Sequence, residues 1–313
     1  MQKYLNVLEY STRVEADKTI MDIIDANSGF VLPDLKVKER PESKVIGSIK
    51  VKSADGNSMK SNGYKDFLLN TKYGDRQRAM DATMLSSHLL EESMVKEGRY
   101  SFHSSAITDG NDAIVIGGSA SSGKTTTMLS SCLKDPEKIK IYSGDRTVID
   151  GQDAIAGTKQ LCIRLGSLLY ELPELKQLIS KDGIKDPWDS STVVAPEDLG
   201  LHADYGPRKI KYFVYPRKGD HELEASIIKD DRAILRLHQD ICAFSGTHPN
   251  VILGQRMVLP DSELDASDRQ KRLDHTVSLA DEVPLIAVSG RLEDIGTYVA
   301  GLILGERVLA DGR

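Results

Sequence analysis

Residues Ile116-Gly-Gly-Ser-Ala-Ser-Ser-Gly-Lys-Thr-Thr-Thr127 connect an apolar run to a helix-like one. Gly118 to Thr125 match the pattern G-x-x-x-x-G-K-[ST], in which backbone amides surround a phosphate chain and a lysine reaches its outer phosphates. The preceding run, Asp112–Gly117, predicts a buried strand, and the following run, Lys124–Lys134, predicts a helix that ends before Pro136. Strand, glycine-rich loop and helix therefore follow one another as a phosphate-binding loop requires.

A glycine turn that happens to end in an exposed lysine is the alternative interpretation of this stretch. It would place the charge of Lys124 at the positive end of a helix dipole, without a negative charge to balance it. A bound phosphate supplies that charge. We therefore expect a nucleotide to be bound through Gly118, Ser119, Ala120, Ser121, Ser122, Gly123, Lys124, Thr125 and Thr126.

The composition of the 313-residue chain restricts its class of partner. It has 47 acidic and 41 basic side chains and a formal net charge of −6, so neither nucleic acid nor an anionic membrane is an expected partner. The polar amino terminus lacks the apolar segment of a signal peptide, and no window has the length of a membrane span. Cys132, Cys162 and Cys242 lie far apart, without metal-binding spacing. We expect a cytoplasmic protein, and a homo-oligomer is compatible with these features.

The chain changes character near Gly98. Before it, short strand-like runs alternate with turns, and a helical pattern of apolar residues ends the region. The expected strands are Tyr4–Glu9, Lys44–Lys52 with Val45, Gly47, Ile49 and Val51 on one face, and Tyr64–Thr71, and the expected helix is Met80–Val95. We expect a β-rich amino-terminal region over residues 1–98 and a second domain over residues 99–313.

The second region alternates strands with helices, which predicts an α/β or α+β domain with helices packed on a sheet. Besides the strand and helix around the glycine-rich loop, the expected strands are Ser101–Thr108, Lys138–Ser143, Ile210–Tyr215, Glu224–Ile228 and Pro284–Val288. The expected helices are Ser167–Ile179, Arg232–Phe244, Asp268–Asp281 and Leu292–Leu304.

A carboxylate follows the expected strand Lys138–Ser143. Proteins that use a nucleotide on such a loop need an acidic residue near Mg²⁺, normally at the end of a neighbouring strand. Asp145 has that position, closer in sequence to the loop than the second carboxylate of common P-loop ATPases. We expect Lys124 to bridge the outer phosphates of ATP, and Thr125 and Asp145 to hold Mg²⁺.

Three segments in this order resemble the HPr kinase/phosphorylase family. They are Arg99–Ile107, which contains His103, then the loop Gly118–Thr125, then Ile141–Ile149, which contains Asp145. The resemblance covers about residues 99–150. It implies a phosphoenolpyruvate-carboxykinase-like nucleotide fold and an ATP- and Mg²⁺-dependent kinase activity.

One position departs from the family's pattern. The family has two adjacent aspartates, which divide metal binding and proton acceptance between them, where this chain has Gly144-Asp145. Asp145 must then serve one purpose, serve both, or be assisted from elsewhere. The residues considered as replacements are His103, Asp150 and Asp204.

Arg164 is the basic residue that we expect to neutralise the transferring phosphate, because it lies in an apolar run where an unpaired guanidinium would be costly. No counterpart of the family's downstream phosphorylation-site signature is found around it. An acidic partner protein such as HPr is also disfavoured by the net charge of −6. We expect the acceptor to be a hydroxyl of a small metabolite or of a serine in a short peptide, with the metabolite favoured.

The expected catalytic residues are Lys124, Asp145, His103 and Arg164. Proton acceptance from the hydroxyl is open between Asp145 and His103, and the sequence does not distinguish ATP from another nucleoside triphosphate. Two other functions fit the same residues. Gly144 favours a nucleotide-binding regulatory protein that lost catalysis with the first aspartate, and an NTPase switch would transfer phosphate only to water.

Overall fold

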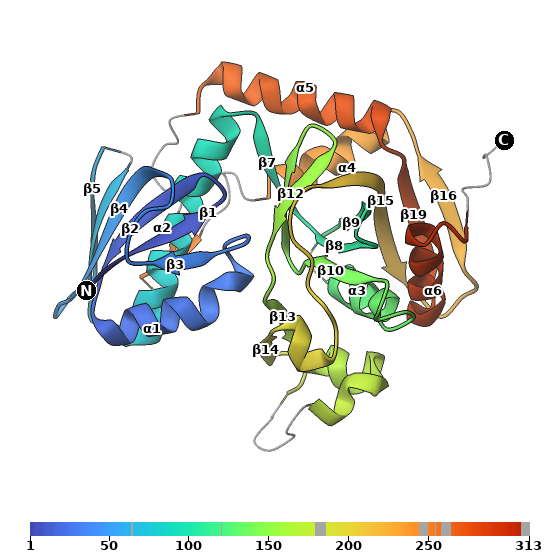
Figure 1. Ribbon diagram of the computed structural model, residues 1–313, viewed down its shortest axis with the longest axis horizontal. Coiled ribbons are helices and arrows are strands. Elements are labelled where there is room, and N and C mark those ends of the chain that lie inside the picture. The colour runs from blue at the N-terminus through green and yellow to red at the C-terminus, as the bar shows by residue number, and fades with distance from the viewer. Residues whose placement is uncertain are drawn as a thin grey trace.

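The computed structural model describes residues 1–63, 65–119, 121–178, 186–243, 250–253, 255–257 and 264–307. A smaller sheet from the amino-terminal part of the chain lies beside a larger one, and helices cover both (Figure 1). The architecture is mixed α/β with several sheets, as the sequence predicts for the class. The strands of the smaller sheet all precede Gly98, and those of the larger sheet begin at Arg99.

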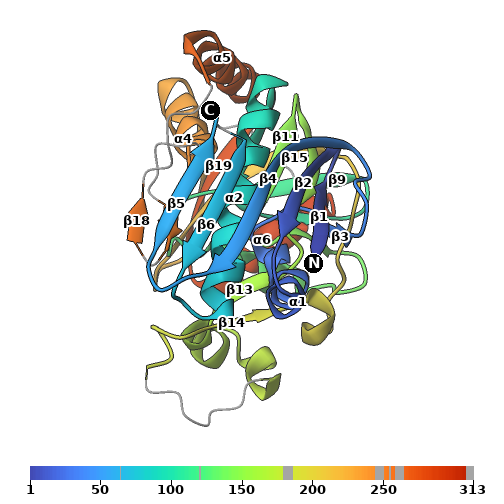
Figure 2. The same ribbon diagram turned by 90° about the vertical axis from the view of Figure 1, so that its left-hand side faces the viewer.

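The amino-terminal sheet has six strands in the order β3-β1-β2-β4-β6-β5 (Figure 2). They are β1 (Gln2–Val7), β2 (Tyr10–Glu15), β3 (Lys36–Lys38), β4 (Lys44–Ser53), β5 (Ser58–Asn62) and β6 (Asp66–Thr71). The apolar sides of α1 (Lys18–Asn27) and α2 (Asp75–Lys96) share one hydrophobic core with this sheet. The predicted helix Met80–Val95 is therefore present, and α2 is longer than expected. It also contacts β7 and α5 of the second region.

The predicted strand at Lys44 is present as β4, but one of the four residues expected on one face differs from the others. Gly47, Ile49 and Val51 are buried, whereas Val45 is 48% exposed and Ile46 is buried. Two consecutive residues of β2 pair with Val45 and Gly47, so Ile46 is an extra residue in β4. Such a β-bulge shifts the in-and-out alternation by one position, which periodicity does not reveal.

The larger sheet has nine strands. One side of it has the order β10-β8-β9-β15. From β15 the sheet continues in two branches. The beginning of β15 pairs with β12, which is followed by β11 and β7, and the second half of β15 pairs with β19, which is followed by β16. The strands are β7 (Arg99–His103), β8 (Ser105–Thr108), β9 (Asp112–Ile116), β10 (Lys140–Ser143), β11 (Arg146–Asp150), β12 (Asp153–Gly157), β15 (Arg208–Lys218), β16 (Glu224–Ile228) and β19 (Leu285–Gly290). The expected single strand Ser101–Thr108 is thus two strands, β7 and β8, which pair with different neighbours.

Helices cover both faces of the larger sheet. Along β9, Ile114 and Ile116 belong to one core and Ala113 and Val115 to another, as alternation requires of a doubly covered strand. The first core includes α3 (Lys124–Cys132) and α6 (Leu292–Ile303), and the second includes α4 (Asp231–Ile241) and α5 (Ala266–Glu282). None of the helices in the described parts of the chain combines the length and the apolar character that crossing a bilayer demands.

Two antiparallel ribbons complete the described structure. They are formed by β13 (Leu161–Arg164) with β14 (Ser191–Val194), and by β17 (Asn250–Ile252) with β18 (Gln255–Met257). The helix expected over Ser167–Ile179 is instead a π-helical turn, Ser167–Glu171, followed by a 3₁₀ helix, Pro173–Leu178. Ile179 lies outside the described residues, as do Phe244 at the end of the next expected helix and Tyr64 at the start of an expected strand.

The two regions are joined through Arg146, the first residue of β11. Its side chain is 1% exposed, and its guanidinium donates to Glu91 Oε2 at 2.6 Å and to the hydroxyls of Ser87 and Ser101. Glu91 and Ser87 lie on α2, so the amino-terminal region is held against the strand that follows Asp145. We refer to Arg146, Glu91, Ser87 and Ser101 as the Arg146 junction.

Candidate active site

The glycine-rich loop leaves the end of β9 and enters α3, as the sequence predicts. Gly118 and Gly123 have φ angles of 129° and 99°, a backbone region that glycine adopts without a steric penalty. A Cβ on Gly118 would also come within 2.7 Å of Ser122 Oγ. Ser121 has a positive φ of 65°, which a residue with a side chain adopts only at a cost. Ala120 lies outside the described residues.

Lys124 is the first residue of α3 and is only 6% exposed. Its Nζ donates to the carbonyl oxygens of Gly118 and Ser119, at 2.9 and 3.1 Å. Burial lowers the pKa of Lys124, and the negative charges of Asp145 and Asp240 oppose that shift. A buried ammonium group that donates to neutral carbonyls would gain from an anionic acceptor, because charge-assisted hydrogen bonds are stronger. The loop therefore fits a phosphate chain.

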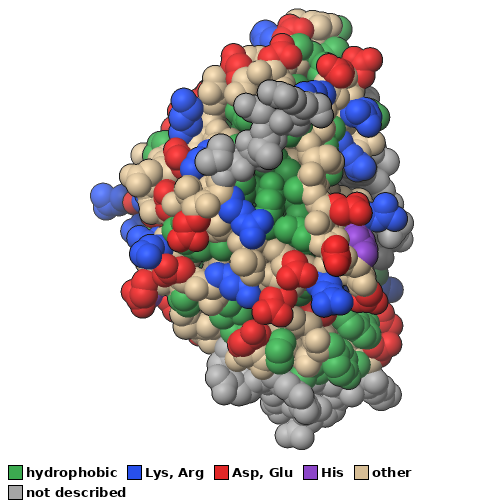
Figure 3. All heavy atoms as spheres, turned by 90° about the vertical axis from the view of Figure 1, so that its right-hand side faces the viewer, with side chains coloured by type: hydrophobic (Ala, Val, Ile, Leu, Met, Phe, Trp, Pro, Cys, Tyr) green, Lys and Arg blue, Asp and Glu red, His purple; other side chains and the backbone are tan. Residues whose placement is uncertain are grey.

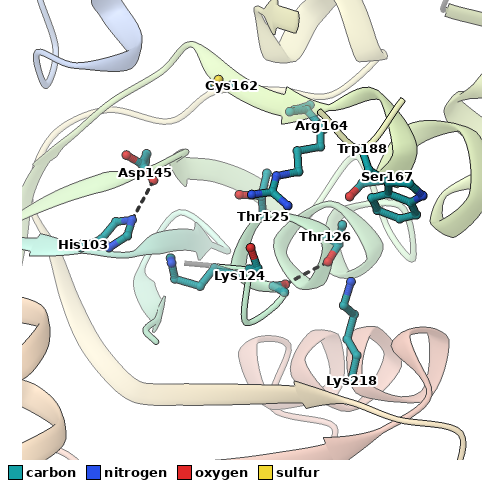
Figure 4. Close-up of a pocket in the computed structure, with 13 residues that line it drawn as sticks. His103, Lys124, Thr125, Thr126, Asp145, Cys162, Arg164, Ser167, Trp188 and Lys218 are labelled. Atoms are coloured by element: carbon teal, nitrogen blue, oxygen red, sulfur yellow. Dashed lines mark hydrogen bonds and ion pairs between the residues drawn. The ribbon is translucent and has the colours of Figure 1, made fainter. Parts of the chain in front are cut away.

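A cavity of about 310 Å³ opens beside this loop (Figure 4), within the size range of small-ligand sites. The structure brings all four expected catalytic residues to it: Lys124, Asp145, His103 and Arg164. Of the expected phosphate-binding residues, Ser121, Gly123, Lys124, Thr125 and Thr126 line the cavity. Gly118, Ser119 and Ser122 belong to the loop but do not line it.

His103 is the last residue of β7 and pairs with Arg146, the first residue of β11. Asp145, in the turn just before β11, therefore lies beside His103. The imidazole Nε2 lies 3.2 Å from Asp145 Oδ1, and the two side chains are 27% and 46% exposed. The amide of Ser104 donates to the Asp145 carbonyl, and the Asp145 amide donates to Thr158 Oγ1 at 3.0 Å. Backbone bonds thus fix the turn on both sides, and the carboxylate orients the imidazole ring.

Gly144 has no room for a side chain. A Cβ at this position would lie 2.6 Å from Leu161 Cδ2 and 3.1 Å from the carbonyl oxygen of Gln160. An aspartate would therefore require the Leu161 side chain to turn aside and the backbone at Gln160 to shift slightly. Leu161 of the neighbouring strand and Gln160 before it thus occupy the space that a side chain at Gly144 would need. Asp145 is the acidic residue of this turn that lines the cavity.

Neither of the other aspartates considered as replacements reaches the cavity. Asp150, at the far end of β11, accepts a hydrogen bond from Arg99 at 3.0 Å. Asp204 accepts two from Arg208, at 2.8 and 3.0 Å. Neither residue is among those that line the cavity, so the hypothesis that Asp150 or Asp204 assists Asp145 is not supported.

Arg164 reaches the cavity for a different reason from the one that the sequence suggested. Along β13, Leu161 and Ile163 are buried while Cys162 and Arg164 are exposed, as strand alternation dictates. Figure 4 shows the Arg164 side chain directed toward Thr125. The expectation of a guanidinium buried in an apolar run was therefore wrong, and Arg164 is an exposed cation at the cavity wall.

Asp240 is a buried carboxylate behind the loop that the sequence analysis did not identify. It lies on α4, is 7% exposed, and its carboxylate occupies the space that a Cβ at Gly117 would need. Burial raises the pKa of Asp240 to about 6, and the hydroxyl of Tyr215, the charge of Lys124 and the amide of Gly118 partly offset that shift. Asp240 therefore places negative charge beneath the loop, toward Lys124.

A signal for Asp240 exists in the sequence. The buried residues of α4 are Ala233, Leu237, Asp240 and Ile241, which recur at helical spacing. An acidic side chain on the apolar side of an amphipathic helix needs a partner, because an isolated buried charge is costly. That pattern would have predicted a buried carboxylate, although not its position beneath the loop.

The site also fits Mg²⁺ that arrives with a nucleotide. No group of three or more His, Cys, Asp or Glu side chains within the described ranges is arranged to hold a metal ion. Magnesium commonly takes only one or two protein ligands and completes its shell with water and phosphate oxygens. The hydroxyl of Thr125 and the carboxylate of Asp145 line the same cavity and are ligands of that kind.

No family model matches this chain, and no curated protein is significantly similar to it. The class is therefore defined by fold and site alone. It is a mixed α/β protein in which a strand, a glycine-rich loop and a helix form one wall of a polar cavity.

Proposed function

We propose that the protein is an ATP- and Mg²⁺-dependent kinase, similar to HPr kinases, that transfers the γ-phosphoryl group to a hydroxyl of a small molecule or a short peptide. The observation that supports this most directly is the shared cavity of Lys124 and the His103–Asp145 pair. A phosphate-binding cation and a group that can accept a proton lie at one site. Those are the parts that phosphoryl transfer requires.

The loop and Lys124 bind and orient the phosphates. The amides at the start of α3 form the positive end of the helix dipole, and Lys124 adds a buried positive charge there. Arg164 neutralises charge from the opposite wall. Mg²⁺, held by Thr125 and Asp145, would supply further charge neutralisation on the phosphoryl group. Positioning and charge stabilisation of this kind account for most of the catalysis in phosphoryl transfer.

The His103–Asp145 pair accepts the proton of the acceptor hydroxyl. As the proton leaves, the hydroxyl oxygen bonds to the γ-phosphorus, and the bond from that phosphorus to the bridging oxygen breaks, giving a phosphate ester and ADP. The carboxylate, 3.2 Å from the imidazole, stabilises the imidazolium that would form. One carboxylate with a histidine thus replaces the adjacent aspartates of the family that the sequence resembles.

A small acceptor is favoured over an acidic protein. The formal net charge is −6, and acidic and basic side chains are interspersed over the face around β16 and α6 (Figure 3). An acidic protein partner is normally met by a patch of positive charge.

The test is incubation of the full chain with γ-labelled ATP, Mg²⁺ and separate metabolite, peptide and protein fractions. Label on a small hydroxyl compound or a peptide serine is the expected result. Lys124→Ala should slow the labelling sharply, and Lys138→Ala, at an exposed lysine, should leave it unchanged. Label on an HPr-type protein and on nothing small would overturn the choice of acceptor.

A regulatory nucleotide-binding protein is the second candidate, because Gly144 leaves the turn with one carboxylate. In the same experiment it would bind ATP tightly and label nothing. Release of labelled inorganic phosphate without any acceptor would instead identify an NTPase switch.

A further inference from the structure

The cavity has two chemically different ends. Lys124, His103 and Asp145 lie toward one end, and Thr126, Ser167, Trp188 and Lys218 lie toward the other (Figure 4). In a phosphate-binding loop the lysine reaches the outer phosphates, while the amides at the helix start hold the inner ones. The nucleoside of a bound nucleotide would therefore leave the loop toward the end that contains Trp188.

Trp188 presents an unusual surface at that end. Its side chain is 42% exposed, and its ring is stacked with that of Tyr170, which is 66% exposed, at a centroid distance of 6.0 Å and an interplanar angle of 25°. Of the two rings, Trp188 lines the cavity, and Tyr170 stacks against it without lining the cavity. Exposed apolar surface at a cavity is typical of a ligand site. A planar ring bound there would cover apolar surface that water now contacts.

The position of Trp188 is fixed by its local backbone. A Cβ at Gly166 would collide with the indole ring, so glycine at this position allows the ring to lie directly on the chain. The amide of Gly166 donates to the Pro187 carbonyl at 2.7 Å, and the amide of Trp188 donates to Asp186 Oδ1 at 2.8 Å. A ring held in place before binding loses little conformational entropy when a ligand stacks on it.

We propose that Trp188, supported by its stacking with Tyr170, forms the nucleobase subsite of the phosphate donor, with the base stacked on the indole ring. This inference rests on the proposed function only in that the loop must bind a nucleotide triphosphate chain. Stacking recognises the face of a ring, so it favours the larger purines over pyrimidines and distinguishes ATP weakly from GTP.

The sequence provides a direct probe, because Trp188 is the single tryptophan of the chain. Titration of the full chain with ATP, GTP, CTP and inorganic triphosphate, each with Mg²⁺, should change the intrinsic fluorescence strongly for the purine nucleotides and weakly for triphosphate. Equal changes for ATP and triphosphate, at saturation confirmed by calorimetry, would overturn the inference.

Substitutions distinguish the contribution of the base to the binding affinity from that of the phosphates. Trp188→Ala should weaken ATP binding about 5- to 100-fold and leave the Kd for triphosphate unchanged, and Trp188→Phe should restore most of the ATP affinity. Tyr205→Ala, at another exposed aromatic residue that does not line the cavity, is the matched control and should change neither Kd. If Trp188→Ala fails to fold, the wild-type fluorescence titration still decides the question.

The two hypotheses fail in different ways. If ATP and triphosphate both bind the wild-type chain and Trp188→Ala binds ATP as tightly, the base subsite is wrong while the phosphate loop stands. If neither ligand binds the wild-type chain, the loop assignment fails and the subsite fails with it.

Discussion

Arg146 and Lys124 are both buried cations, one at the junction between the two regions and one in the glycine-rich loop, and their partners differ. Arg146 is 1% exposed and donates to a carboxylate and two hydroxyls. Lys124 is 6% exposed and donates to two neutral carbonyls, with carboxylates nearby that affect its pKa. Arg146 therefore depends on its carboxylate partner inside the fold, whereas Lys124, held by neutral acceptors, is suited to an anionic ligand.

The largest expected effect is at the Arg146 junction. Glu91→Gln removes the charge that Arg146 pairs with, and breaking a buried pair from one side typically costs about 3–5 kcal/mol. Denaturant unfolding should show that loss in the free energy of unfolding. Glu137→Gln, at an exposed position, should change it by less than about 0.5 kcal/mol. Equal stability of Glu91→Gln and the wild type would mean that Arg146 is compensated by other groups.

The next effect distinguishes the loop from the junction. Lys124→Ala should reduce kcat about 10²- to 10³-fold, because it removes a preorganised contact to developing charge. Its free energy of unfolding should not fall, since burial of the ammonium already disfavours the charged form. Steady-state transfer of labelled phosphate and denaturant unfolding measure the two quantities. Near-normal turnover in a folded variant would contradict the assignment of the loop.

Asp240 gives a smaller, pH-dependent effect. Its pKa is raised from 3.8 to about 6, so between these values the folded protein binds more protons than the unfolded chain. The free energy of unfolding contributed by this group therefore falls as pH rises from about 4 to about 6. Asp240→Asn should remove that fall and stabilise the fold at pH 7 by up to about 3 kcal/mol.

The measurement for Asp240 is the free energy of unfolding of both proteins as a function of pH. Asp220→Asn, at an exposed position, is the control and should leave the curve unchanged. A variant that is less stable than the wild type at pH 7 would show that the ionised carboxylate stabilises the loop.

The smallest effect is expected at Asp150. Its ion pair with Arg99 is partly exposed, at 49% and 25%, and exposed pairs are worth about 0–1 kcal/mol. Asp150→Asn should therefore change stability by less than about 1 kcal/mol and leave turnover unchanged. A clear loss of turnover would indicate that Asp150 assists Asp145 in catalysis.

The parts of the fold that were predictable have strong local signals. The segment from β9 through α3 has an apolar run, three glycines and a helical pattern in one continuous stretch, and its described residues fold as expected. By contrast β2, β3, β5 and α1 were not predicted. The three-residue β3 is held by its pairing with β1 rather than by its own pattern.

The site shows the same division. The sequence located Lys124, Asp145 and His103, because each lies next to the loop or in a segment that resembles a known family. It did not find Asp240, which comes from a distant part of the chain and meets the loop only in the folded protein. The sequence showed that Gly144 removes a carboxylate. It could not show that the Leu161 side chain occupies the space where a side chain at Gly144 would lie.

The Arg146 junction also limits how the chain can be divided or recombined. Arg146 directly follows Asp145, and the core of the amino-terminal region includes Val148 and Ala156 from β11 and β12. A shortened chain that begins at Gly98 would leave a guanidinium without Glu91 and uncover apolar side chains at the strand beside the proton acceptor. An amino-terminal region taken from another protein would therefore have to supply groups that pair with Arg146 in the place of Glu91 and Ser87. The two regions thus depend on each other for folding.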